Sequence, residues 1–216
     1  MDFGSMMIEL LKGSLITIEL FVIAFPLSII LGMGITLCVK SKFKPLKYFF
    51  EFYIYIFRGT PLLLQMLILY YGLFYIPGVG QYLVIQNRMF ACILAFTLNY
   101  AAYFAEIFRG GFLAVDKGQY EAAKVLGFSK GQTLWRIIFP QMFRVALPSL
   151  ANETITLVKD TSLIFALGIQ ELLQNATNIV NSEATFLPYV VCAVFYLVLT
   201  TIPSIIFKKL EKKFAF

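Results

Sequence analysis

The chain has 216 residues, a net charge of +6 and a mean hydropathy of +0.81, with 60% hydrophobic residues and only 14% charged ones. A water-soluble domain carries about 25% charged residues, so this composition excludes a compact soluble fold and indicates an integral membrane protein. The chain has no His, and its three Cys residues are isolated without a CxxC pair, so we expect no catalytic residues, no metal site and no disulfide framework.

Five apolar segments are expected to cross the membrane as helices, since a span needs about 20 mostly apolar residues. They lie at residues 14–39, 61–76, 89–107, 145–169 and 186–207. The second segment is short and follows an aromatic stretch, residues 49–57, which we expect to lie in the membrane interface before a break at Arg58-Gly59-Thr60-Pro61. The first segment has Asp2 and Glu9 in its flank and no A-x-A site, so we expect a retained helix and not a signal peptide.

The Lys and Arg residues are divided unevenly between the two ends of these spans. One end holds those between spans one and two, between spans three and four, and after span five: Lys40, Lys42, Lys44, Lys47, Arg58, Arg109, Lys117, Lys124, Lys130, Arg136, Arg144, Lys208, Lys209, Lys212 and Lys213. The other end holds only Lys12 and Arg88, while Lys159 lies within span four. By the positive-inside rule the N-terminus is outside and the C-terminus is cytoplasmic. Ordinary topology therefore explains the basic charge, and we expect no nucleic-acid partner.

The longest polar stretch, residues 108–143, is expected to face the cytoplasm and to contain a short helix. Asp116 suits the N-cap, Glu121 lies early in the helix where its charge favours the dipole, and Gly127 suits the position after the helix. A short exposed helix is marginal alone, so we expect it to dock onto a partner.

A spaced motif runs through this stretch. Glu121-Ala122-Ala123, Gly127, Ile137 and Pro140 match the spacing EAA-x3-G-x9-I-x-L-P, with Phe139 in place of the usual Leu. The motif resembles that of permease subunits of ABC importers. Three further segments resemble the polar amino acid uptake branch of that family: residues 58–65, residues 102–111, and Lys159-Asp160-Thr161-Ser162-Leu163. The alternative for the short helix alone is an ordinary amphipathic loop helix.

The resemblance implies one all-α transmembrane domain over residues 1–216, with five spans and a cytoplasmic coupling helix between spans three and four. It implies a second permease protomer, expected to be identical, a cytoplasmic ABC ATPase dimer and an extracytoplasmic amino acid binding protein, assembled in the lipid of the cell inner membrane. The ATPase-coupling residues it implies are Gln119, Glu121, Ala122, Ala123, Lys124 and Gly127. No GxxxxGK[ST] motif occurs, so we expect ATP and Mg²⁺ on the ATPase and no cofactor or enzyme activity on this chain.

Span four carries the ionisable side chains that point to a substrate path. Each costs at least about 2.5 kcal/mol at membrane depth, so they are expected to face a pathway or each other. Glu153 and Asp160 share one helical face about 10 Å apart, while Asn152 and Lys159 share a second face. We predict a binding position at Glu153 and an outer vestibule at Asp160, which suit a cationic substrate. The alternative is that these carboxylates pair with Lys159 across the dimer or serve helix packing.

Span three adds polar residues on one face. Asn99 and Tyr103 are predicted contacts in the pathway, whereas Glu106 has Arg109 one turn on and is predicted to form an interface ion pair with it. The candidate substrate-binding residues are Glu153, Asn152, Asp160, Asn99, Tyr103 and Lys159.

We therefore interpret the chain as the permease subunit of an ATP-driven importer for polar amino acids, with arginine, lysine or histidine favoured. One alternative is an ion channel or proton-coupled secondary carrier that uses the cluster of Glu153, Asp160 and Lys159. Five spans without a visible inverted repeat count against a secondary carrier. The other alternative is the same importer class with glutamine or glutamate as substrate.

Overall fold

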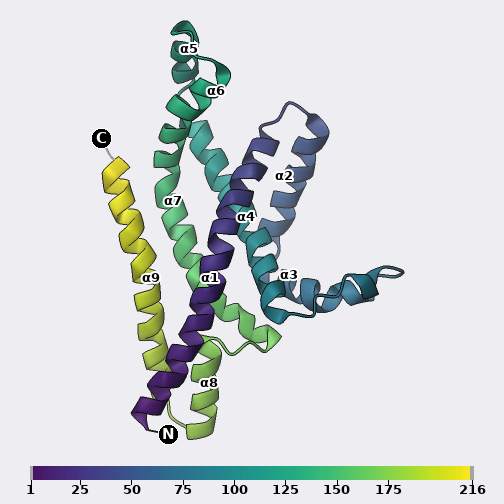
Figure 1. Cartoon of the computed structure of the whole chain (residues 1–216), viewed down its shortest axis with the longest axis vertical. Helices are drawn as coiled ribbons and strands as arrows, with labels where there is room; N and C mark the ends of the chain where they lie inside the picture. Colours follow the sequence, from purple (N-terminus) through teal and green to yellow (C-terminus); the bar gives the residue numbers. More distant parts are fainter. Residues whose placement is uncertain (1, 215–216) are drawn as a thin grey trace.

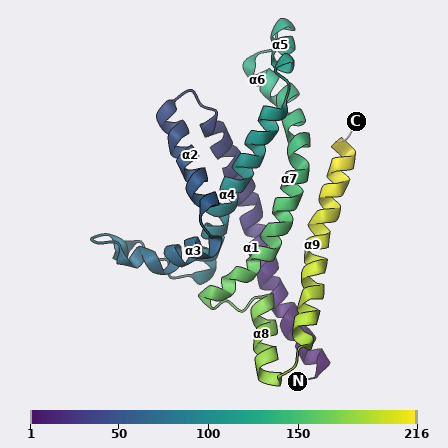
Figure 2. The ribbon, with the colours of Figure 1, turned by 180° about the vertical axis from the view of Figure 1, so that it is seen from behind.

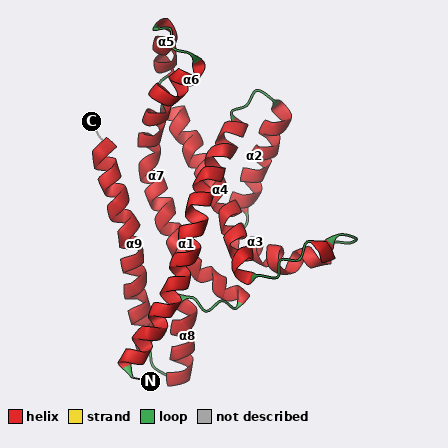
Figure 3. Cartoon of the chain, viewed as in Figure 1, coloured by secondary structure: helices red, strands yellow, loops and turns green. Residues whose placement is uncertain are grey.

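The computed structural model describes residues 2–214, which form helices joined by short loops and, within that range, contain no β-strand (Figure 3). The expectation of an all-α chain is confirmed. In chain order the helices are α1 Phe3–Val39, α2 Lys44–Gly59, α3 Leu62–Leu67, η1 Ile68–Gly72, η2 Leu73–Tyr75, η3 Gly80–Tyr82, α4 Arg88–Ala114, α5 Lys117–Val125, α6 Lys130–Thr133, η4 Leu134–Ile138, α7 Phe139–Asp160, η5 Thr161–Leu167, α8 Leu172–Glu183 and α9 Leu187–Phe214.

Three of these helices, α1, α4 and α9, are long and apolar enough to cross a membrane, and a fourth span results if the bent pair of α2 and the segment Leu62–Tyr75 is one span. Helix α7 is outside this group and carries Glu153, Lys159 and Asp160. The count of five spans and the orientation remain predictions.

The second predicted span differs most from the structure. Residues 49–57, expected to lie in the membrane interface, are part of the longer helix α2, which packs against α1 and α4. At Thr60 and Pro61 the chain turns by 107°, and α3 with the short helices after it projects sideways from the bundle (Figure 1). Pro61 has no backbone N–H to continue the ladder and disfavours a helical residue before it, so the break lies where the sequence placed it.

Helices α1 and α4 form the tightest pair in the bundle. Small residues make this possible: a Cβ on Gly32 would lie 2.9 Å from the carbonyl oxygen of Ala101. The Thr36 hydroxyl donates to the Ala105 carbonyl oxygen at 2.9 Å. Small interfacial residues allow this close backbone approach, and hydroxyl groups bond across it, as is typical of helix pairs in membranes.

The structure gathers the basic segments at one end of the molecule. The α1–α2 connection, the pair α5 and α6, and the C-terminal end of α9 lie at that end in both views, opposite α8 and the start of α1 (Figures 1 and 2). This arrangement agrees with the charge distribution from which the orientation was predicted.

Helix α8 was missed by the hydropathy pattern and lies between α7 and α9 in sequence. Glu171 caps it, because its carboxylate accepts from the backbone N–H groups of Leu173 and Gln174, both at 2.8 Å, and from the Tyr196 hydroxyl at 3.0 Å. Burial raises the pKa of Glu171 above its ordinary value, and these donors oppose the rise. The start of α1, α8 and the start of α9 share a small separate core.

Candidate functional site

A polar cavity of about 310 Å³ lies between the end of α2, the second half of α4 and the first half of α7. Its lining residues are Arg58, Tyr103, Glu106, Ile107, Gly110, Gly111, Val145, Ala146, Ser149 and Glu153. The volume lies at the lower end of the range for small-molecule sites, about 300–1,000 Å³. The structure thus brings the predicted residues Tyr103 and Glu153, from two different helices, to one cavity.

The carboxylate of Glu106 is already neutralised. Arg109 donates to it through Nε at 2.9 Å and through a second guanidinium nitrogen, and Arg58 Nη1 lies 3.8 Å away. The predicted pair of Glu106 and Arg109 is therefore confirmed. The Arg58 guanidinium also lies 5.4 Å from the centre of the Tyr103 ring, within the range of a cation–π contact.

Glu153 differs from Glu106 in its contacts. Within residues 2–214 its carboxylate makes no hydrogen bond and no ion pair, although the side chain is half-buried and lies within electrostatic range of Arg58 and Asp160. An unpaired carboxylate in a partly buried wall is costly, so a bound cation there is favoured. Arg58, at the end of α2 and 3.8 Å from Glu106, adds a positive group to the wall of the same cavity.

Asp160 lies further along the same face of α7, at its last residue. Its carboxylate accepts from the Tyr100 hydroxyl of α4 at 2.7 Å. Asp160 is half-buried and does not line the 310 Å³ cavity, so the structure places it beside the cavity rather than in it.

Asn99, a predicted contact in the pathway, does not line the 310 Å³ cavity. Its side chain is 4% exposed, and its amide donates to the Phe57 carbonyl oxygen and to Gln65 Oε1, both at 3.0 Å. Gln65 in turn donates to the Phe57 and Thr60 carbonyl oxygens. These bonds satisfy backbone carbonyl oxygens near the break between α2 and α3. Asn99 therefore stabilises the turn beside Arg58, which lines the cavity.

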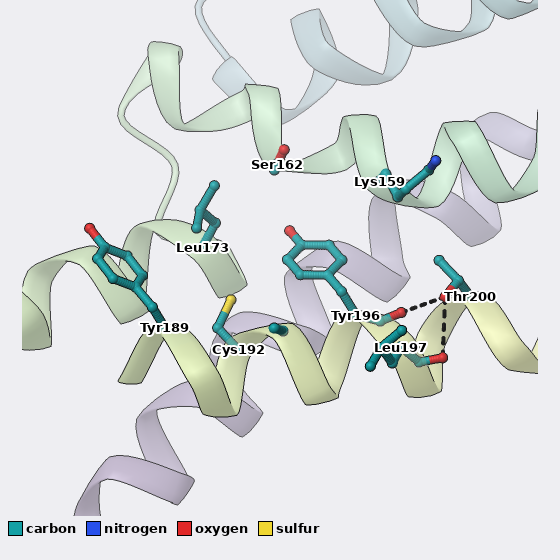
Figure 4. A pocket seen from close by; sticks show the side chains of 9 residues that line it. Lys159, Ser162, Leu173, Tyr189, Cys192, Tyr196, Leu197 and Thr200 are labelled. Atoms are coloured by element: carbon teal, nitrogen blue, oxygen red, sulfur yellow. Dashed lines mark hydrogen bonds between the residues drawn. The ribbon is translucent and has the colours of Figure 1, made fainter. Parts of the chain in front are cut away.

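Asn152 and Lys159 do not line the cavity, in agreement with their rotation of about 100° from Glu153 and Asp160 on α7. Asn152 is exposed, and Lys159 lies at an apolar groove of about 590 Å³ between α7, α8 and α9. Figure 4 shows Lys159 and Ser162 on one side of this groove, with Tyr189, Cys192, Tyr196 and Thr200 of α9 across from them. The structure therefore separates the predicted polar cluster into two sides of α7.

The predicted coupling helix is α5, and its ends form as the sequence predicted. The Asp116 side chain accepts from the Gly118 backbone N–H at 2.6 Å. Gly127 has a φ of +77°, and the N–H of Phe128 reaches the Ala123 carbonyl oxygen at 3.0 Å, which is the C-terminal motif that glycine favours. Ala123 is buried, while Glu121, Ala122, Lys124 and Gly127 are exposed; Gln119 is exposed and bonds to Gln141 at 3.0 Å.

Two polar side chains of the cavity wall, Arg58 and Ser149, were not predicted as site residues. Arg58 was counted as a topological charge and as part of the segment 58–65, although a cation beside a Gly-Thr-Pro break was a usable signal. Ser149 has no distinguishing pattern, and only the packing of α7 against α4 brings it to the wall.

Three comparisons relate the chain to known proteins. Residues 4–216 match the family described as "Binding-protein-dependent transport system inner membrane component". The chain is 35% identical to the arginine transport system permease protein ArtQ of Bacillus subtilis, covering 94% of this chain and 91% of ArtQ. It is 39% identical to a Rickettsia conorii protein provisionally named glutamine transport system permease protein GlnP, covering 94% and 92%.

A third relative and a solved structure are also similar. The chain is 36% identical to the histidine/lysine/arginine/ornithine transport system permease protein HisQ of Escherichia coli, covering 95% of this chain and 93% of HisQ. A crystal structure described as an amino acid ABC transporter with histidines matches 99% of both chains, with a TM-score of 0.86 and 33% identity.

Proposed function

The chain belongs to the family of inner membrane components of binding-protein-dependent transport systems and is an amino acid permease of an ABC importer, and from this premise we propose that its cargo is a polar amino acid with a basic side chain. The observation that carries the proposal is Glu153, a half-buried carboxylate of the cavity wall that forms no ion pair and no hydrogen bond within residues 2–214, whereas Glu106 in the same wall is paired. The similarity to ArtQ and HisQ supports the same choice.

We propose that the substrate lies between α4 and α7. Its α-carboxylate meets Arg58, and a cationic group meets Glu153, because these are the opposite charges that the cavity offers on opposing helices. Tyr103 contributes a polar phenol and holds the Arg58 guanidinium over its ring. Asp160, held by Tyr100, lies near the outer side and attracts the cation toward Glu153.

We propose five spans, with α2 and α3 as a broken second span, α7 as the fourth, the N-terminus outside and α5 in the cytoplasm. Two copies of the chain form a homodimer, because one sequence carries every family segment. Each α5 docks into a groove of a cytoplasmic ATPase subunit, which binds ATP and Mg²⁺, and an extracytoplasmic binding protein delivers the amino acid. The exposed face of α5 supports this docking, since Val125 is 87% exposed and Leu126 is 74% exposed.

Movement of the ATPase subunits then moves α5, and α4 and α7 reorient around the cavity. The permease contributes differential binding and a gated path, while ATP hydrolysis on the partner supplies the free energy.

The proposal is tested by uptake of labelled arginine into proteoliposomes that contain the permease, its ATPase and its binding protein. Unlabelled lysine and histidine are expected to compete with arginine, while glutamine and glutamate compete poorly. Stronger competition by glutamine would assign the substrate to the amide class, which the similarity to GlnP favours. Uptake without ATP that follows an ion gradient would instead support a channel or secondary carrier.

A further inference from the structure

A second charged cavity lies at the basic end of the molecule, away from the amino acid site. Its volume is about 620 Å³, and it opens between the C-terminal end of α1 and the pair α5 and α6. Lys40 comes from the end of α1, Lys124 from α5 and Lys130 from α6. Lys40 and the two lysines of the α5–α6 segment, distant from it in sequence, therefore line one cavity.

These lysines have no negative partner. None of them forms an ion pair within residues 2–214, and no Asp or Glu of that range lines the cavity. The Lys40 ammonium instead lies 3.6 Å from the centre of the Phe112 ring, and burial lowers the pKa of Lys40. Three like charges in one cavity repel one another, so an anion is favoured there.

Most of the remaining wall is apolar. The rings of Tyr120 and Phe128 and the side chain of Leu134 line it, together with the hydroxyl-bearing residues Ser129 and Thr133. A free phosphate or another hydrated anion uses only the charged and hydroxyl groups of such a wall, whereas a phospholipid has a phosphate and acyl chains joined in one molecule. The cavity is therefore amphipathic in the same way as a lipid.

The location agrees with the headgroup level of a membrane. Lys40 follows the last residue of α1, one of the helices long and apolar enough to span the bilayer. Trp135, next to Leu134, is 63% exposed, and exposed Trp side chains are typical of the membrane–water interface. Figures 1 and 2 place α5 and α6 just beyond the ends of α1 and α4.

The cavity overlaps the residues of α5 expected to couple to the ATPase only at Lys124. Tyr120 and Lys124 are four residues apart and line the cavity, whereas Glu121 and Val125 are on the neighbouring face, rotated by about 100°, and do not line it.

We propose that this cavity binds an anionic phospholipid of the cytoplasmic leaflet, with Lys40, Lys124 and Lys130 around its phosphate and the apolar wall against its acyl chains. Basic pockets beside transmembrane helices on the cytoplasmic side bind such headgroups. The leaflet follows from the proposed orientation, but lipid binding itself can be measured without transport. A lipid bound there contacts α1, α5 and α6 together. It therefore contacts α5, the helix proposed to couple to the ATPase.

The test compares the retention of phosphatidylglycerol and of phosphatidylcholine with identical chains, by native mass spectrometry of the permease–ATPase complex. The cavity variant carries Lys40→Gln, Lys124→Gln and Lys130→Gln. The control variant carries the same three charge losses at Lys208, Lys209 and Lys212, on the last turns of α9. A third variant with Arg at the three cavity positions keeps the charge.

We expect the wild type, the control and the Arg variant to retain phosphatidylglycerol in preference to phosphatidylcholine. Each basic residue near an anionic headgroup contributes about sixfold, so the cavity variant should bind phosphatidylglycerol on the order of a hundredfold more weakly. Equal loss in the control, or unchanged retention in the cavity variant, would overturn the proposal. Full displacement of the lipid by inorganic phosphate would also overturn it, because the cavity would then bind a soluble anion. Retention of the lipid only in the absence of the ATPase would overturn it as well, because the ATPase would then occupy the cavity in the complex.

Discussion

Replacement of Glu153 by Gln is the most informative change in the amino acid cavity. The amide keeps the shape of the side chain and removes the charge, and no hydrogen bond or ion pair of Glu153 within residues 2–214 is lost with it. Glu106 cannot substitute for the lost charge, because Arg109 already neutralises it. The change therefore reports on the contact with the substrate.

The magnitude follows from the bond that is lost. A hydrogen bond to a charged group contributes about 1.5–3 kcal/mol, which corresponds to roughly tenfold to more than a hundredfold in affinity. We expect uptake of subsaturating arginine or lysine to fall by such a factor, and uptake of glutamine to change far less. Folding should be spared, because an amide is cheaper to bury than a carboxylate.

The assay is initial uptake into proteoliposomes with ATPase and binding protein present, with labelled arginine and labelled glutamine measured in parallel. Glu19→Gln is the matched control, because Glu19 is exposed on α1 and lies outside the cavity. Equal losses for arginine and glutamine in the Glu153 variant would refute the basic-substrate reasoning and assign Glu153 to the α-amino group shared by both. Full retention of arginine uptake would remove Glu153 from the binding site.

Three further changes test other parts of the account. Glu121→Lys on α5 should abolish coupling of ATP hydrolysis to uptake or prevent co-purification with the ATPase, because a reversed charge in a docking groove costs about a few kcal/mol. Glu211→Lys on α9 is the control with the same charge change. Normal uptake by the Glu121 variant, or an equal defect in the control, would contradict the docking role of α5. Gly32→Leu should lower the free energy of unfolding by about 1–3 kcal/mol, seen as a lower midpoint of thermal unfolding in detergent, because the new side chain meets the α4 backbone. Gly34→Leu should leave the midpoint unchanged, since a Cβ at Gly34 meets nothing within 4 Å. Equal midpoints for the two variants would exclude the close contact between α1 and α4. Asn99→Ala should cost about 1–3 kcal/mol in the same measurement by leaving buried partners unpaired, and an unchanged midpoint would remove its role at the α2–α3 break.

Local signals predicted the parts of the fold that depend on neighbouring residues. The start of α5 at Asp116, its end at Gly127 and the break at Pro61 each follow from the conformation or hydrogen bonding of one residue type. The 107° turn was not predictable, because hydropathy counts apolar residues without regard to the direction of the chain. Helix α8 was missed because its sequence is too polar for the hydropathy pattern, and because the burial of its cap, Glu171, and the bond from Tyr196 depend on tertiary packing.

The candidate site was predictable only as far as helical periodicity extends. The separation of Glu153 and Asp160 from Asn152 and Lys159 follows from the rotation per residue. Which of these faces meets α4 and which meets α9 depends on packing, and so the sequence did not separate the cavity from the groove. Asn99 shows the same limit, because its partners at the α2–α3 break are brought to it only by the fold.

The location of the substrate is tested most directly by protection of a cysteine in the cavity wall. In a background with Cys38, Cys92 and Cys192 replaced by Ala, Ser149→Cys reports on the cavity and Ala193→Cys reports on the groove of Figure 4. The measurement is the rate of alkylation by a small maleimide in the permease–ATPase complex, with and without saturating arginine. We predict that arginine slows alkylation at Ser149→Cys and leaves the rate at Ala193→Cys unchanged. Protection of Ala193→Cys alone, or of neither position, would contradict the assignment of the amino acid to the cavity between α4 and α7.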